Sequence, residues 1–350
     1  MQITPEISCR IKLLRLPLII GIVTIHSSIN SVGYADKFFQ TLIAGTWGGS
    51  CVAFLFMLSG FLFFRNFNLS LNSYKEKLQS RFWTLLVPYL FWNLALLTLV
   101  LIVINVPATS GIIQGHYKKY IGDYSFANFI DCLTGYKSLY PIAFHFWYVR
   151  DLMAMVILSP VFLLIARKIP YLGIALFAAP WLLDFQIGFS IQWLGPLFFY
   201  LGCLIAVQKL DLTWLDRRKS AIIGIYLGMA LVLTITQTAD IKTFQHQLEC
   251  CTRVMGTAAI WCASDLVSGK LEKACFNFSG LAFFVYAIHE PTVTVFKEVF
   301  NKLSKPSSSI TVIVYYLLTI ILATLVTLAV GSFLQRYTPK FFQTITGARG

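Results

Sequence analysis

An arginine and a histidine stand eleven residues apart on either side of an almost unbroken apolar run. Arg15 precedes this run and His26 follows it. Eleven residues are close to three helical turns, so in a helix both side chains would share one face, roughly 16 Å apart along the axis. Because an ionisable group inside a bilayer is costly, such a group usually serves a function. Histidine offers a base near neutral pH, and arginine offers a cation that matches phosphate.

Four further stretches place polar side chains inside or beside apolar runs. They are Ser59-Gly60 ahead of Arg65; Lys77 and Arg81; His145, Trp147, Tyr148, Arg150 and Asp151; and Tyr286, His289 and Glu290. Each has a structural explanation too: basic residues anchor helix ends, aromatic residues gather at the membrane interface, and small residues or buried histidines join helices. Asp151 could serve only as an ion-pair partner of Arg150. Because five such stretches occur in one chain, we interpret them as one polar seam across the bilayer.

The composition indicates an integral membrane protein. Of the 350 residues, 57% are hydrophobic and only 12% are charged, whereas soluble domains carry about 25% charged residues. The apolar runs lack the alternation of barrel strands, so we expect helices. Judged against the ~20 residues that a bilayer requires, about ten runs qualify or nearly qualify: 14–31, 47–65, 82–104, 146–166, 171–184, 191–207, 220–237, 250–267, 279–297 and 309–333. We predict an all-α, polytopic transmembrane bundle that forms a single domain over residues 1–350.

The distribution of basic residues predicts the orientation. With the N-terminus inside, most Lys and Arg fall in cytoplasmic segments, so both termini are expected in the cytoplasm. The longest connection, about 105–145, would then be external, and its glycines and tyrosines suit a loop that touches a polar ligand. The net charge of +13 has this same topological origin, and we expect membrane lipid and no nucleic acid as a partner. The eight scattered cysteines predict neither a disulfide framework nor a metal site.

Taken in order along the chain, these stretches resemble the acyltransferase-3 family of membrane O-acyltransferases. The resemblance is carried by Arg15-x10-His26, by the Phe-rich segment ending Ser59-Gly60-Phe61, by His145-x-Trp147-Tyr148-Val-Arg150 and by Tyr286-x-x-His289-x-Pro291. Members of the family are ten-helix inner-membrane enzymes, and many acetylate sugars of lipopolysaccharide, capsule or exopolysaccharide. The resemblance therefore implies a stand-alone, multi-pass O-acetyltransferase of the bacterial inner membrane that modifies a surface polysaccharide such as lipopolysaccharide O antigen.

The resemblance also implies substrates and residue roles. Acetyl-coenzyme A would be a co-substrate, with no permanently bound cofactor, and a polysaccharide or undecaprenyl-linked sugar would be the acceptor. His26 is similar in position to the family's catalytic histidine and Arg15 to its essential partner. Arg81 matches the first arginine of a cytoplasmic R-x-x-R that is thought to help hold the donor. Three positions depart from the family: Lys12 replaces a common acid, Leu16 a frequent glycine, and Thr84 the second arginine.

Chemistry suggests how these groups would divide the reaction. We predict that His26 is the general base, with Arg15 and His289 completing the catalytic set, because a neutral imidazole accepts a proton near pH 7. The other expected roles are donor binding for Arg65, Arg81 and Lys77, acceptor binding for His145, Trp147, Tyr148 and Arg150, and site positions for Ser59, Tyr286 and Glu290. No metal ligand set is expected. An acyl-Ser59 intermediate is less favoured, because the sequence shows no partner that would activate this hydroxyl.

Two other functions stay open at this point. The first is a multi-spanning transporter or flippase of lipid-linked sugars, although the chain lacks the duplicated half-pattern common in transporters. The second is a membrane sensor or scaffold without catalysis, which the departures at Lys12 and Thr84 would allow. The acyl group also stays open, since pocket volume cannot be read from sequence and succinyl or another short group would serve.

Overall fold

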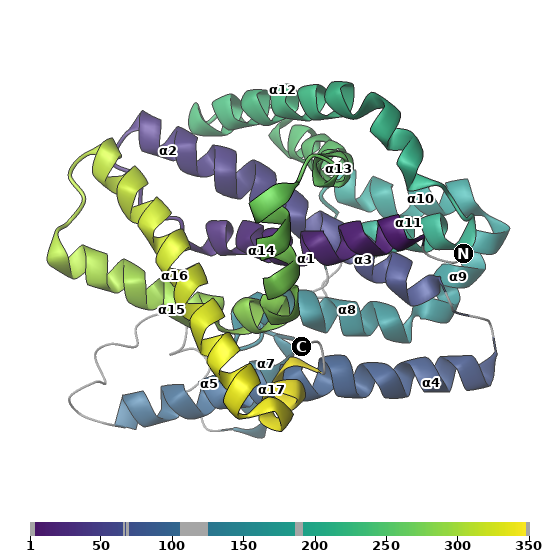
Figure 1. The fold of residues 1–350 in the computed structure, drawn as a ribbon, viewed down its shortest axis with the longest axis horizontal. Coiled ribbons are helices and arrows are strands. Elements are labelled where there is room, and N and C mark those ends of the chain that lie inside the picture. Colours follow the sequence, from purple (N-terminus) through teal and green to yellow (C-terminus); the bar gives the residue numbers. More distant parts are fainter. Residues whose placement is uncertain (1–3, 66, 68–69, 106–124, 186–191, 348–350) are drawn as a thin grey trace.

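The computed structural model describes residues 4–65, 67, 70–105, 125–185 and 192–347, and all regular secondary structure among them is helical. Figure 1 shows the helices packed around α1 and α3, with α12 above them in this view and α4 and α5 below. The predicted class, a transmembrane helical bundle, is confirmed. The number of crossings and the side on which the termini lie stay predictions.

The N-terminal half is built largely from two long continuous helical rods. Helix α2 runs through a π-helical segment into α3, and α4 runs through a second π-helical segment into α5. The bounds are α1 (Pro5–His26), α2 (Tyr34–Gln40), the first π-helical segment (Thr41–Gly48), α3 (Gly49–Phe64), α4 (Leu71–Arg81), the second π-helical segment (Phe82–Leu86) and α5 (Val87–Asn105).

Shorter helices follow, and then the long C-terminal pair. The bounds are α7 (Phe126–Thr134), a 3-10 turn (Phe144–Phe146), α8 (Trp147–Ile157), α9 (Ser159–Lys168), α10 (Pro170–Leu182), α11 (Leu194–Val207), a 3-10 segment (Leu212–Arg218), α12 (Lys219–Thr238), α13 (Gln245–Ser264), α14 (Gly269–Phe278), a second 3-10 turn (Ser279–Leu281), α15 (Ala282–Leu303), α16 (Ser309–Tyr337) and α17 (Pro339–Thr346).

Every apolar run singled out in the sequence coincides with a helical segment, but the lengths differ. Among the described residues, five continuous helical segments are long and apolar enough to cross a membrane, or six if the pair α8 and α9 counts as one span bent by 63°. The bend falls beside Pro160 in the first turn of α9, and a proline ends or kinks a helix because it lacks the amide hydrogen. Of the predicted external connection, residues 106–124 lie outside the described residues, and the remainder contains α7 and the 3-10 turn before α8.

Helix α1 runs through the core and carries both Arg15 and His26. Thr4 caps its N-terminus by accepting a hydrogen bond from the Ile7 amide at 3.3 Å, and Pro5 occupies the first turn, where a missing amide hydrogen costs nothing. Most of its residues from Leu13 to Thr24 are buried, so α1 is surrounded by other helices rather than lipid. Of the two site residues on α1, Arg15 is exposed and opens into cavities, whereas His26 is half-buried.

Helices α3 and α11 approach each other closely at two glycines. A β-carbon on Gly60 would collide with the backbone carbonyl of Phe199, and one on Gly202 would collide with the carbonyl of Met57. Small residues at such contacts let helix backbones pack closely in membranes. This packing fixes the side of α3 that bears Ser59 relative to the rest of the bundle.

Candidate active site

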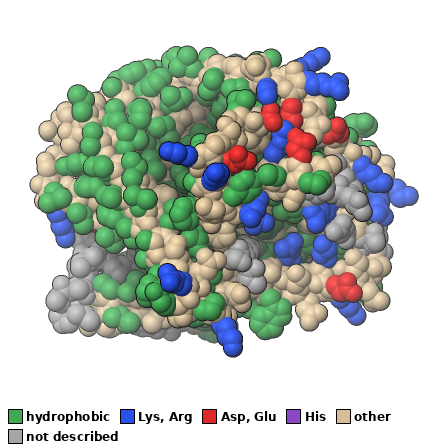
Figure 2. Space-filling model, viewed as in Figure 1, with side chains coloured by type: hydrophobic (Ala, Val, Ile, Leu, Met, Phe, Trp, Pro, Cys, Tyr) green, Lys and Arg blue, Asp and Glu red, His purple; other side chains and the backbone are tan. Residues whose placement is uncertain are grey.

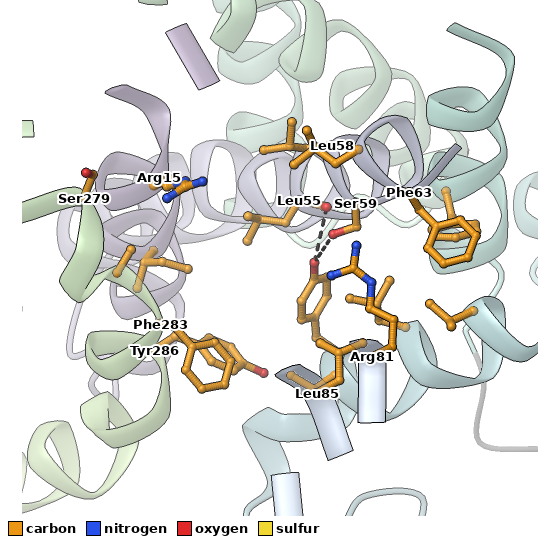
Figure 3. Close-up of a pocket in the computed structure, with 18 residues that line it drawn as sticks. Arg15, Leu55, Leu58, Ser59, Phe63, Arg81, Leu85, Ser279, Phe283 and Tyr286 are labelled. Carbon is orange, nitrogen blue, oxygen red and sulfur yellow. Dashed lines mark hydrogen bonds between the residues drawn. The ribbon is translucent and has the colours of Figure 1, made fainter. Parts of the chain in front are cut away.

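A cavity of about 500 Å³ lies among α1, α3, α8 and α15. Its polar lining comes from Arg15, Ser59, Arg81, Tyr148 and Tyr286, and most of the remaining lining is apolar. Figure 3 shows Arg15 entering from α1 and Arg81 from the end of α4, with Tyr286 and Phe283 on a separate wall. Two guanidinium groups in a largely apolar pocket are suited to a ligand with an anionic end and a long, thin body.

A second cavity, of about 360 Å³, adjoins the first and is strongly basic. Lys12, Arg15, Arg65 and Lys77 line it, and it shares Arg15 and Leu62 with the larger cavity. Among the described residues, no Asp or Glu lines either cavity. Figure 2 shows Lys and Arg side chains gathered beside a hollow on this face, between α1 and α4. Such a group of cations is electrostatically suited to a multiply charged anion.

Three histidines from three separate segments form a cluster. The ring of His289 on α15 lies 5.0 Å from that of His26 on α1 and 5.0 Å from that of His145, measured between ring centroids. Phe144 packs against His26 at 5.2 Å. The sequence predicts an acceptor-binding role for His145. The structure places its ring beside His289, which also packs against His26.

Hydrogen bonds fix the protonated nitrogen on two of these rings. His289 donates from Nδ1 to the carbonyl of Tyr286 at 2.6 Å, and His145 donates from Nε2 to the carbonyl of Ala287 at 3.1 Å. A carbonyl only accepts, so the other nitrogens, Nε2 of His289 and Nδ1 of His145, are acceptors when the rings are neutral. Both are buried and have no hydrogen-bond partner among the described residues. The cluster thus holds nitrogens able to take a proton.

Tyr286 connects the larger cavity with the histidine cluster. Its side chain lines the cavity, while its hydroxyl donates to the carbonyl of His145 at 2.6 Å. Its ring lies 5.9 Å from that of His289 and 5.8 Å from that of His145. None of the three histidines lines the cavity. In this conformation the cavity ends at Tyr286, and the imidazoles lie beyond it.

Ser59 has a partner that sequence reasoning could not identify. Its Oγ lies 2.9 Å from the hydroxyl of Tyr148, which donates to the carbonyl of Leu55 at 3.2 Å. Figure 3 shows Ser59 close to the guanidinium of Arg81. A phenol that donates its own proton to a carbonyl is not a base for a neighbouring hydroxyl. Tyr148 therefore does not activate Ser59 as a nucleophile in this arrangement.

The remaining predicted site residues contact protein groups. Arg150 forms an ion pair with the fully buried Asp151 at 2.8 Å and donates to the carbonyls of Thr134 and Leu139 at 3.1 and 2.8 Å. This is the ion pair that the sequence left open as an alternative. Trp147 packs on Phe56 at 5.9 Å between ring centroids, and neither Trp147 nor Arg150 lines the cavity.

Glu290 is buried beside the histidine cluster on α15 and is 8% exposed. Its carboxylate accepts a hydrogen bond from the hydroxyl of Thr294 at 3.0 Å. Like Trp147 and Arg150, it lies outside the cavity lining. Glu290 follows His289 in the chain and therefore lies near the histidine cluster, outside the two cavities.

Comparison with known proteins identifies the family of the chain. The acyltransferase domain of the acyltransferase-3 family matches residues 10–331, and the chain belongs to this family. The chain is also similar to the succinoglycan biosynthesis protein ExoH of Rhizobium meliloti (strain 1021), with 24% identity over 358 residues that cover 98% of this chain and 93% of that protein. No solved structure matches. The resemblance inferred from the motifs is confirmed, and the protein is a multi-pass membrane acyltransferase.

Proposed function

We propose that the protein transfers a short acyl group, acetyl in the first instance, from coenzyme A to a hydroxyl of a cell-surface polysaccharide or its lipid-linked precursor. Membership of the acyltransferase-3 family supports the reaction, and similarity to a protein named for succinoglycan biosynthesis supports a polysaccharide as acceptor. The observation that carries the proposal is the pair of joined cavities, basic at one end and ending at Tyr286 beside three histidines. The bacterial inner membrane is the proposed location.

The basic cavity would hold the phosphates of the donor. Coenzyme A carries a diphosphate and a separate phosphate, and guanidinium and ammonium groups pair with such oxygens. Lys12, Arg15, Arg65 and Lys77 offer these groups in one cavity that no carboxylate lines. The larger cavity continues from Arg15 and suits the long pantetheine arm, with Arg81 along its side. The thioester would then arrive near Tyr286.

The histidine cluster would supply the base. In the proposed step, His26 accepts the proton of the sugar hydroxyl while the oxygen of this hydroxyl attacks the thioester carbonyl. The new ester C–O bond forms, the C–S bond breaks, and the proton passes to the departing thiolate. His289, with its ring 5.0 Å from His26 and its Nε2 free to accept, would share the proton during transfer. The thioester and the acceptor must meet where Tyr286 now separates the cavity from the rings.

The proposed acceptor side lies around His26 rather than around Arg150. Arg150 is occupied by Asp151 and two carbonyls, and Tyr148 lines the donor cavity. The half-buried His26 ring, beside Phe144, is the member of the cluster that an external hydroxyl would reach. The apolar face of a sugar ring packs well against an aromatic ring, and the sugar hydroxyls can then contact a neighbouring polar group.

Label transfer distinguishes this function from transport. Membranes containing the protein would be incubated with radiolabelled acetyl-coenzyme A and surface polysaccharide of the producing strain, de-O-acylated with mild alkali. We expect alkali-labile label in the polysaccharide, and none with membranes that lack the protein. Movement of unmodified lipid-linked sugar across the membrane, without label in the glycan, would instead support a flippase.

A further inference from the structure

Helix α1 ends at His26, and the end of this helix is held by side chains from two other helices. The hydroxyl of Tyr316 on α16 donates to the carbonyl of Thr24 at 3.2 Å. The ammonium of Lys297 on α15 donates to the carbonyl of His26 itself at 3.3 Å. The last four carbonyls of a helix have no partner within the helix, so side chains that reach them fix its final turn.

The His26 ring depends on this main-chain support more than the other two histidines do. His145 and His289 are each oriented by a ring-nitrogen hydrogen bond to a carbonyl. For His26, the recorded contacts of the ring among the described residues are the packing contacts with Phe144 and His289. Since packing alone leaves a ring more freedom than a directed hydrogen bond, the position of the backbone largely sets where the ring lies.

Lys297 belongs to the same helix as His289, about two turns further along. One helix therefore presents both the imidazole that faces His26 and the cation that holds the carbonyl of His26. Lys297 is half-buried, and burying an ammonium is costly unless charges offset it. Glu290 and Glu298, on the same helix, are the carboxylates whose negative charge stabilises the ammonium of Lys297. A half-buried cation is thus kept at the end of α1.

We propose that Lys297 is a positioning residue for the transfer reaction, which holds the end of α1 so that the His26 imidazole stays in register with His289. This inference rests on the proposed function, in which His26 is the base. Lys297 lines neither donor cavity, so its effect falls on the transfer step and not on donor binding. A small misplacement of a catalytic group is enough to slow a reaction strongly.

The test replaces Lys297 in the full-length protein in membranes, with labelled acetyl-coenzyme A and de-O-acylated polysaccharide as probes. For Lys297→Met, which keeps an apolar chain of similar length but no donor, we expect kcat to fall about ten-fold or more with the donor KM unchanged. Lys297→Arg keeps a cationic donor and should recover most of this loss. Lys302→Met, at an exposed position on the same helix, should match the wild type.

Tyr316→Phe removes the other anchor of the final turn and should lower kcat in the same direction. This variant decides the matter if Lys297→Met fails to insert. Wild-type kcat in both Lys297→Met and Tyr316→Phe would overturn the proposal, and so would equal losses in Lys297→Met and Lys297→Arg.

The His26→Ala variant distinguishes the base role of His26 from the positioning role of Lys297. If His26→Ala is inactive while Lys297→Met keeps wild-type kcat, only the positioning role is wrong. If His26→Ala stays active, the base assignment fails, and the role of Lys297 fails with it.

Discussion

Arg15 and His26 lie on one face of α1, as their spacing predicts, and that face is turned toward α15. Arg15 lines the larger cavity together with Phe283 and Tyr286, and His26 packs on His289. Helical periodicity fixes this relation because it needs only the chain between the two residues. The approach of His145 to the same cluster could not be predicted, since it depends on how a distant segment folds back onto α15.

Substitution of Arg81 tests the proposed binding site for the acyl donor. Arg81→Met keeps the apolar stem but removes a guanidinium that lines the larger cavity and forms no ion pair among the described residues. Because a charge-assisted contact is worth about 1.5–3 kcal/mol, we expect the KM for acetyl-coenzyme A to rise about ten-fold or more. Initial rates over a range of donor concentrations measure it. Arg167→Met, at an exposed position outside the cavities, is the control.

A fall in kcat at unchanged donor KM would contradict the donor-binding role of Arg81. That result would place the guanidinium at the reacting carbonyl instead, near Ser59 and Tyr148.

Helical elements were predicted from sequence more completely than their connections were. Each apolar run forms helix because lipid leaves the backbone no other partner. The predicted apolar runs 47–65 and 82–104 leave a polar connection between them, yet α4 (Leu71–Arg81) in this connection is helical and continues into α5. Its charged residues gave no apolar stripe to reveal a helix. This continuity is what carries Arg81 and Lys77 to the cavities.

The contact between α3 and α11 gives the prediction at the scale of elements. Gly202→Val adds a branched side chain where the carbonyl of Met57 leaves no space. Overpacking of this kind costs about 1–3 kcal/mol, so we expect a lower melting temperature in detergent and reduced activity, because α3 bears Ser59. Gly224→Val on α12 has nothing within 4 Å of its β-carbon and is the matched control. Equal melting temperatures for the two variants would contradict the close packing.

At the scale of the whole molecule, charge pairing separates structural cations from the donor site. Arg10 on α1 is buried and pairs with Glu6, Asp216 and Asp265 at 2.8, 2.9 and 2.8 Å. This pairing ties the start of α1 to the segments around α12 and α13. Lys219 forms a further ion pair with Asp265 at 2.5 Å.

The basic cavity, in contrast, is lined by no carboxylate. The sequence contained both sets of charges but could not show which would find partners, because the acidic partners come from distant segments. The cations of the basic cavity thus lie toward the N-terminal end of α1, away from His26, where an anionic ligand can reach them.

The most direct measurement is acyl transfer by His26→Ala beside the wild type, at matched protein levels in membranes, with labelled acetyl-coenzyme A and de-O-acylated polysaccharide. The account predicts that donor binding, followed by equilibrium retention of label on the purified protein, persists while transfer to polysaccharide is lost. Transfer by His26→Ala at a rate near that of the wild type would contradict the central claim that this imidazole takes the proton of the acceptor.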